Sequence, residues 1–186
     1  MELGGANTYS GDTYNKSAAV AAPIKLIANE VIPNGPGKGN FCLYGNNTVL
    51  DLNGFNETIN GLANNGTTFV DNTAPDTTST LTFGDNNFSG WYSGKFRDTG
   101  SGATLNLVKT GSGIMILSGV NEHSGTTTIN EGTLRLGGAT ALGTVDGGTI
   151  VNAGGALDLN DFALTLQEPL LLSGQASLWS TLSQRG

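Results

Sequence analysis

The chain of 186 residues has few of the side chains that usually carry chemistry. It contains one cysteine, Cys42, one histidine, His123, and eight Lys and Arg residues against fifteen Asp and Glu. A single cysteine excludes an intramolecular disulfide, and one histidine without a cysteine partner argues against a zinc site. The basic residues are dispersed, which argues against binding to nucleic-acid phosphates. We therefore expect no metal, no cofactor and no nucleic-acid partner.

Long apolar runs are also missing. The most apolar stretch, residues 18–32, contains Pro23, Lys25 and Glu30, so it is too short and too polar to span a bilayer. No basic segment followed by an apolar one comes after Met1, so no signal peptide is visible. We expect no membrane insertion of this segment, and if the native protein is exported we expect this chain to be a piece of it.

The sequence is instead rich in turn formers and short apolar alternations. It has 29 Gly, and charged residues make up only 12% of it. Alternations such as Leu105-Asn106-Leu107 and Leu134-Arg135-Leu136 place leucine on one face of a strand, and the glycines between them favour turns. Strong helix formers are scarce outside a few Leu and Ala. The pattern predicts an all-β protein with many turns.

An internal repeat narrows the choice among all-β architectures. Residues 3–13 align with residues 117–127 at an offset of 114 (117 − 3), and residues 50–55 align with residues 157–162 at an offset of 107 (157 − 50). A long repeat with several strands favours a solenoid. The two offsets differ, which predicts a looped insertion near residues 16–47. We expect residues 1–186 to form a single segment with about one and a half long repeats.

Residues 110–137 resemble the autotransporter-associated β-strand repeat. The segment has Thr-Gly, alternating apolar residues, Ser-Gly-x-Asn, a threonine run and Gly-Thr-Leu-x-Leu-Gly, and residues 3–15 resemble a truncated second copy. His123 stands where the family usually has Tyr, which Tyr9 keeps. The resemblance implies a right-handed parallel β-helix in the passenger region of a larger bacterial surface or secreted protein, at the cell surface or outside the cell.

Such a helix has a predictable core. Coils of roughly 20 residues, stacked about 4.8 Å apart, would give about nine turns. The alternating leucines should point inward and stack as ladders between coils. The leucines assigned to these ladders are Leu50, Leu52, Leu105, Leu107, Leu134, Leu136, Leu157, Leu159, Leu164 and Leu166.

No catalytic set emerges from the sequence. His123 and Ser124 are neighbours that should point to opposite faces, so a Ser-His-Asp triad is not expected. Asp51 and Asp158 hold equivalent positions in the two copies, which makes them repeat features rather than a unique acid pair. We expect no enzyme, and a polysaccharide-degrading enzyme is the least favoured alternative.

Trp91 and Tyr92 are the candidate ligand-binding residues. They belong to an aromatic group with Phe88 and Phe96, and exposed aromatic rings can stack on sugars. The alternative, which the sequence favours, is that Phe88, Trp91 and Phe96 fill or cap the core. The leading hypothesis is a structural extracellular stalk that belongs to a larger surface protein. Its alternative is an adhesin-type module that holds a polysaccharide or a host surface.

Overall fold

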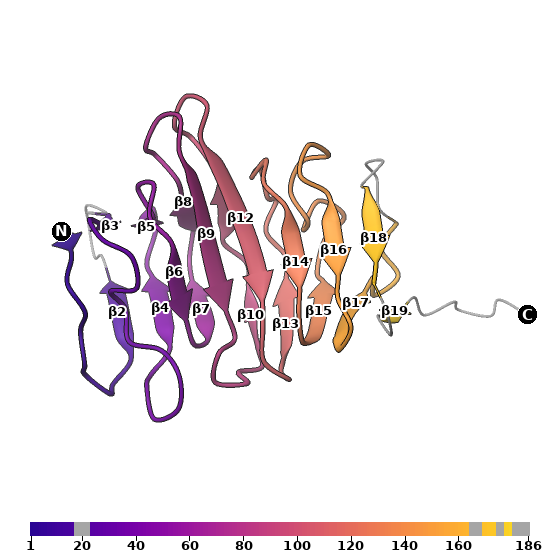
Figure 1. Ribbon diagram of the computed structural model, residues 1–186, viewed down its shortest axis with the longest axis horizontal. Coiled ribbons are helices and arrows are strands. Elements are labelled where there is room, and N and C mark those ends of the chain that lie inside the picture. Colours follow the sequence, from indigo (N-terminus) through magenta and orange to yellow (C-terminus); the bar gives the residue numbers. More distant parts are fainter. Residues whose placement is uncertain (17–22, 164–168, 174–176, 180–186) are drawn as a thin grey trace, which may run out of the picture.

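The protein is a solenoid built from parallel strands. The computed structural model describes residues 1–16, 23–163, 169–173 and 177–179, and its strands coil into about seven turns (Figure 1). Within those ranges no helix is long and apolar enough to cross a membrane. The predicted fold class, an all-β parallel β-helix, is confirmed.

Three faces run along the helix. The first face is a five-stranded sheet, in the order β1 (Glu2–Leu3), β3 (Ile24–Leu26), β5 (Thr48–Asp51), β8 (Thr68–Asp71) and β11 (Lys95–Arg97). The second face is a six-stranded sheet, in the order β6 (Glu57–Ile59), β9 (Thr78–Phe83), β12 (Thr104–Lys109), β14 (Thr127–Ile129), β16 (Thr149–Val151) and β18 (Leu170–Leu172).

The third face is made of two sheets that follow one another. The first contains β2 (Thr13–Lys16), β4 (Phe41–Tyr44) and β7 (Leu62–Asn65). The second contains β10 (Gly90–Tyr92), β13 (Ile114–Leu117), β15 (Gly132–Leu136), β17 (Gly155–Asp158) and β19 (Ser177–Trp179). Strand β10 lies beside β7, so this face continues from one sheet to the next.

The coils differ in length because loops of different size join the faces. Thr13 pairs with Phe41, 28 residues later (41 − 13), whereas Ile114 pairs with Thr133, 19 residues later (133 − 114). Most coils are longer than the value assumed from the sequence, so the chain makes fewer turns than expected. The division of the chain into long repeats with one insertion stays a prediction.

The core consists of inward side chains stacked in register. Ile24, Leu50, Val70 and Phe96 form one such column on the first face, and all four are buried. The predicted ladder leucines that are fully buried are Leu50, Leu52, Leu105, Leu107, Leu134, Leu136 and Leu157. Leu159 is partly buried and packs against this core, while Leu164 and Leu166 lie outside the described residues.

A lysine occupies one of these core columns. Lys109 is in register with Phe83 and Ile129 on the second face and is almost fully buried. Its ammonium donates hydrogen bonds to the carbonyls of Thr110 (2.7 Å) and Gly111 (2.7 Å) at the end of the strand. Burial lowers the pKa of Lys109 to about 8, and the stem of the side chain fills the space of an aliphatic residue.

A glutamate closes the open edge of the second face. Glu57 lies in β6, the edge strand of that sheet, and its carboxylate is buried. It accepts the backbone N–H groups of Val31 (2.9 Å) and Ile32 (3.0 Å), which belong to the preceding coil. Burial raises the pKa of Glu57 to about 7, although these hydrogen bonds act in the opposite direction.

Candidate functional site

Strand β10 presents the two candidate binding residues to opposite sides of the sheet. Trp91 is 60% exposed, whereas Tyr92 is fully buried with its ring centroid 4.9 Å from that of Phe96. Burial strongly raises the pKa of the Tyr92 hydroxyl. Phe96 fills the core as the sequence indicated, but the expectation that Trp91 does so is wrong, because alternation along the strand turns it outward. Of the candidate pair, only Trp91 presents its ring to solvent.

The Trp91 side chain is held in place on the outer surface. Its indole N–H donates a hydrogen bond to the hydroxyl of Ser118 (2.6 Å). Trp91 is in register with Ile116, which is in register with Arg135 on the next strand. That a ligand contacts Trp91 stays a prediction.

A groove follows the corner between the third and first faces. Its volume is about 360 Å³, and it is lined by Gly66, Thr67, Thr68, Phe69, Ser93, Gly94, Lys95 and Val120. The two cations nearby already have partners. Lys95 pairs with Glu122 at 2.6 Å, and the Arg97 guanidinium lies 3.9 Å from the centre of the Phe69 ring. The groove therefore offers an apolar floor and hydroxyl groups rather than a charged centre.

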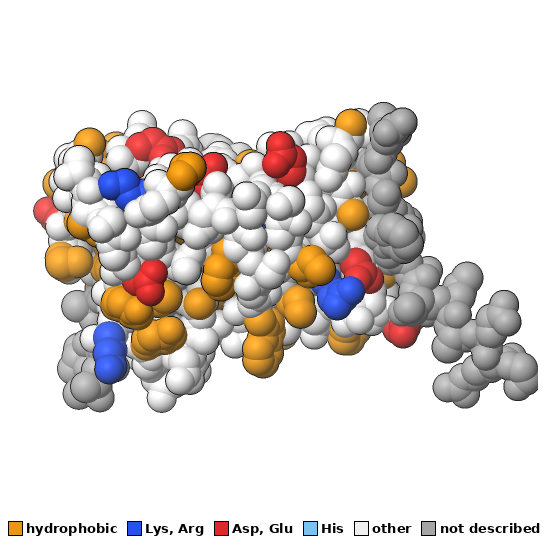
Figure 2. Space-filling view, turned by 90° about the horizontal axis from the view of Figure 1, so that it is seen from below, with side chains coloured by type: hydrophobic (Ala, Val, Ile, Leu, Met, Phe, Trp, Pro, Cys, Tyr) orange, Lys and Arg blue, Asp and Glu red, His pale blue; other side chains and the backbone are white. Residues whose placement is uncertain are grey.

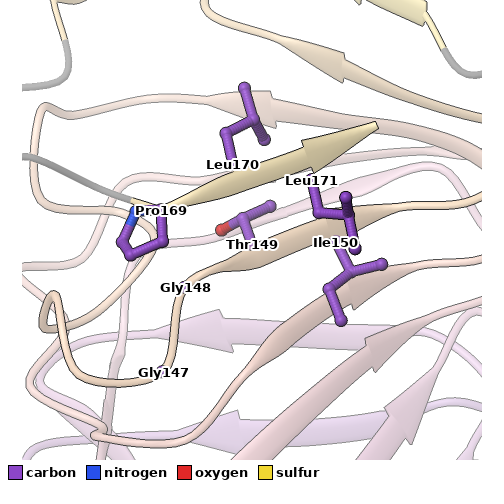
Figure 3. Close-up of a pocket in the computed structure, with 7 residues that line it drawn as sticks. All are labelled: Gly147, Gly148, Thr149, Ile150, Pro169, Leu170 and Leu171. Carbon is purple, nitrogen blue, oxygen red and sulfur yellow. The ribbon is translucent and has the colours of Figure 1, made fainter. Parts of the chain in front are cut away.

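A smaller hollow lies between β16 and β18 (Figure 3). Its volume is about 190 Å³, and its lining is mostly glycine and apolar side chains, with Thr149 as the polar exception. Ile150 and Leu171 project from neighbouring strands, in register with each other. This lining provides no acid, base or nucleophile beyond one hydroxyl.

The histidine is a core residue. His123 is fully buried, its Nε2 lies 3.1 Å from the Thr127 hydroxyl, and its ring meets the Phe96 ring edge-on at 6.1 Å. Burial lowers its pKa to about 4. In this position it cannot serve as a base for an external substrate.

The carboxylates of the first face are also engaged. Asp51 lies 3.9 Å from Lys25, and Asp71 accepts a hydrogen bond from Arg97 at 2.7 Å. Asp71 also accepts the backbone N–H of Thr99 in the following coil (3.0 Å). Across the part of the chain that the structure describes, no three His, Cys, Asp or Glu side chains gather as a possible metal site.

The two aligned copies make the same contacts at their aromatic position. In the first copy the Tyr9 hydroxyl is hydrogen-bonded to the hydroxyl of Thr13 (2.6 Å). In the second copy His123 contacts the hydroxyl of Thr127, also four residues later (3.1 Å). The histidine thus replaces tyrosine without losing the hydrogen bond.

An asparagine links coils in both copies. The Asn7 side chain donates to the carbonyl of Val31 in the following coil (2.7 Å), and Asn121 donates to the carbonyl of Ala141 (2.6 Å). Asn121 also accepts the N–H of Phe96 from the preceding coil (3.0 Å). Its side chain therefore ties three successive coils together.

A second pair of asparagines, Asn53 and Asn160, links each coil to the one before it. Asn53 donates to the carbonyl of Leu26 (2.9 Å) and Asn160 to that of Leu136 (3.0 Å), both in the preceding coil. Both residues adopt left-handed backbone conformations, with φ of 50° and 47°. Asparagine tolerates this conformation better than most residues.

The aspartates two residues before these asparagines, Asp51 and Asp158, also make equivalent contacts in the two copies. Asp51 is in register with Lys25, and Asp158 is in register with Arg135, with which it forms an ion pair at 2.6 Å. Each aspartate accepts the N–H of the asparagine two residues later at 2.9 Å. The internal repeat seen in the sequence is therefore also a repeat of contacts.

Comparison with known proteins finds a family model that matches part of this repeat. Residues 1–14 and 107–136 match the model of the passenger-associated-transport-repeat. These two stretches are similar to the passenger-associated transport repeat. A stretch of 84 residues is 40% identical to the protein named Adhesin BmaC autotransporter from Brucella suis biovar 1 (strain 1330). The aligned stretch makes up 45% of this chain but only 2% of that relative. No solved structure matches the chain.

The passenger-associated transport repeat occupies different faces in its two copies. Leu3 lies in β1 on the first face, but the aligned Leu117 lies in β13 on the third. Thr13 lies in β2 on the third face, and the aligned Thr127 lies in β14 on the second. In both copies the residues between the two strands cross one face without forming a strand. The repeat is thus a local unit that does not depend on the face it covers.

Proposed function

We propose that this chain is a rod-forming segment in the passenger region of a larger bacterial surface or secreted protein. The observation that carries the proposal is the set of contacts between coils, which recur at equivalent positions of the internal repeat. A solenoid buries its core by stacking, so each coil supports its neighbours and the rod can carry or space other parts of a long chain. The small share of the relative that this chain covers agrees with such a role.

A structural role rather than an enzymatic one is part of this proposal. The lone histidine is buried, and the acids that the sequence made candidates are engaged in ion pairs and turns. The second candidate function is that of an adhesive module, supported by the exposed ring of Trp91 and by the word adhesin in the name of the relative. A location at the cell surface or outside the cell follows from either function.

A surface-display experiment tests the rod. The chain would be placed between an epitope tag and a membrane barrel that exports passengers, and the displayed protein would be treated with protease. We expect a resistant fragment the size of the chain, because stacked coils leave few backbone segments open.

A pair of matched variants tests whether the protease resistance depends on the packed core. Leu107→Asp places a charge in the core, whereas Val108→Asp places one on the outer surface of the same strand. The first should remove the resistant fragment and the second should keep it. A displayed wild-type chain that is digested completely would contradict the proposal.

A further inference from the structure

The outer surface of the third face carries an aromatic stripe, which we define as Tyr14, Tyr44 and Trp91 with the smaller Cys42, Ala63 and Ile116. Tyr14 is in register with Cys42, and Cys42 with Ala63, on three successive strands. The stripe then continues from β7 to β10, where the N–H of Ser93 donates to Asn64 (2.9 Å). Figure 2, the view from below Figure 1, shows apolar side chains in an interrupted row along the helix axis.

Two of the three rings of the stripe are exposed, the third, Tyr44, is half-buried, and each ring has a defined contact. Tyr14 is 52% exposed and Trp91 is 60% exposed. The Tyr14 hydroxyl donates to Asp12 (2.8 Å), its ring lies 5.7 Å from that of Tyr44, and Trp91 is anchored to Ser118. A surface of rings that are already ordered loses little side-chain entropy when a ligand binds.

The strands that build the stripe are almost free of charge. Together β2, β4, β7 and β10 contain one charged residue, Lys16, which is in register with Tyr44. Farther along the face, Arg135 and Asp158 form an ion pair and neutralise each other. The stripe therefore suits an uncharged ligand better than an anionic or cationic one.

The spacing of the coils indicates the shape of that ligand. Parallel strands are about 4.8 Å apart, which is close to the length of one sugar unit in an extended β-1,4-linked chain. Sugars of such a chain present flat C–H faces that stack on aromatic rings, while their hydroxyl groups face the sides. Between the outer rings Cys42 is buried and the small Ala63 is half-buried, so no large side chain projects above the rings there.

We propose that the aromatic stripe binds an extended, uncharged polysaccharide that lies lengthwise along the third face. The proposal goes beyond the rod function, since a rod needs no ligand. It assigns Trp91 and Tyr14 as the outer stacking platforms and Tyr44 as the ring beside Tyr14. It leaves Tyr92, one of the sequence candidates, in the core.

Titration calorimetry with cellohexaose and with chitohexaose tests the proposal on the whole chain. We expect at least one of them to bind, and to bind more tightly than its trisaccharide because the longer chain reaches more coils. Trp91→Ala and Tyr14→Ala should each weaken binding by about tenfold, which corresponds to the loss of one aromatic contact. Tyr9→Ala removes an exposed ring outside the stripe and should leave the affinity unchanged.

Circular dichroism and melting curves of each variant separate loss of binding from loss of the fold. A folded wild-type chain that binds neither hexasaccharide would overturn the proposal and leave the rod function standing. Binding that survives both Trp91→Ala and Tyr14→Ala would overturn it as well. Loss of the rod would instead appear as an absent β-sheet signal in the wild-type chain.

Discussion

Asparagine and aspartate side chains perform the linking between coils that a packed core alone does not provide. Asn121 bonds both to the coil before it and to the coil after it, while Asn53 and Asn160 bond backward. A buried or half-buried carbonyl without a partner costs free energy, so each such bond fixes the register of two coils. The high asparagine content of the chain thus has a structural use in addition to forming turns.

Substitutions of Asn53 should separate the contribution of its backbone from that of its side chain. Asn53→Gly keeps the left-handed backbone but loses the bond to Leu26, and should lower the free energy of unfolding by about 1 kcal/mol. Asn53→Ala loses the same bond and, unlike glycine, keeps a β-carbon in the left-handed conformation without the amide that makes it tolerable in asparagine, which should add about 1 kcal/mol. Urea unfolding of the two variants shows which of them has the lower free energy of unfolding. An alanine variant as stable as the glycine variant would contradict this account of the turn.

Glu57 should make stability depend on pH in the acid-to-neutral range. Its pKa is raised to about 7 in the folded protein from 4.5, so the folded state binds a proton more tightly than the unfolded state. Stability contributed by the protonated form is therefore fully present below about pH 4.5 and is lost as the pH rises through 7. The loss is on the order of 3 kcal/mol across this window.

The measurement is the difference between the wild type and Glu57→Gln, each unfolded in urea between pH 4 and pH 8. The difference is needed because His123, with a pKa lowered to about 4, contributes the opposite slope: its stabilisation is lost as the pH falls from 6.5 toward 4. We expect the stability of Glu57→Gln relative to the wild type to rise as the pH rises. A pH-independent difference would show that Glu57 keeps an ordinary pKa.

At the scale of strands, alternation along the chain predicted the inward residues well. Leu105, Leu107, Leu134 and Leu136 are all buried, as their spacing required. The same rule could not decide which of Trp91 and Tyr92 faces inward, because β10 has only three residues and such a short strand shows no clear alternation. That choice depends on Phe96 and Thr68, which lie on other strands beside the Tyr92 ring.

One strand allows a direct test of the inward and outward assignment. Leu134→Asp buries a carboxylate in β15 and should cost more than about 4 kcal/mol, because its described neighbours in the inward column, Met115 and Leu157, offer no cation. Thr133→Asp adds the same charge to an adjacent, outward position and should change the stability by less than about 1 kcal/mol. Thermal unfolding followed by circular dichroism compares the two. Equal melting temperatures would mean that Leu134 does not belong to the core.

At the scale of the whole molecule, the resemblance to the autotransporter-associated β-strand repeat predicted the parallel β-helix, which is confirmed, and the match to a passenger repeat supports the resemblance. The composition could not predict the coil lengths, since these depend on how many residues each corner loop takes. It also could not predict that Lys109 and Glu57 lie in inward positions. Those positions become acceptable only through carbonyl and N–H groups that neighbouring coils supply.

The rotation of the repeat between faces has the same origin. Two copies at an offset of 114 residues (117 − 3) are separated by a number of turns that is not whole, so the second begins on another face. The face on which the second copy begins is set only by the actual lengths of the coils between the two copies. The local contacts of the repeat were predictable in outline, whereas its place around the helix required the structure.

The register between coils is the central claim, and a pair of engineered cysteines tests it most directly. In a chain with Cys42→Ala, Thr82→Cys and Val108→Cys lie opposite each other on the outer surface of β9 and β12, within the reach of a disulfide. Thr82→Cys and Thr128→Cys are the matched control, because β12 separates their strands. We expect mild oxidation to link the first pair nearly completely and the control pair hardly at all. Linkage of the control pair, or none in the first pair, would contradict the parallel stacking described above.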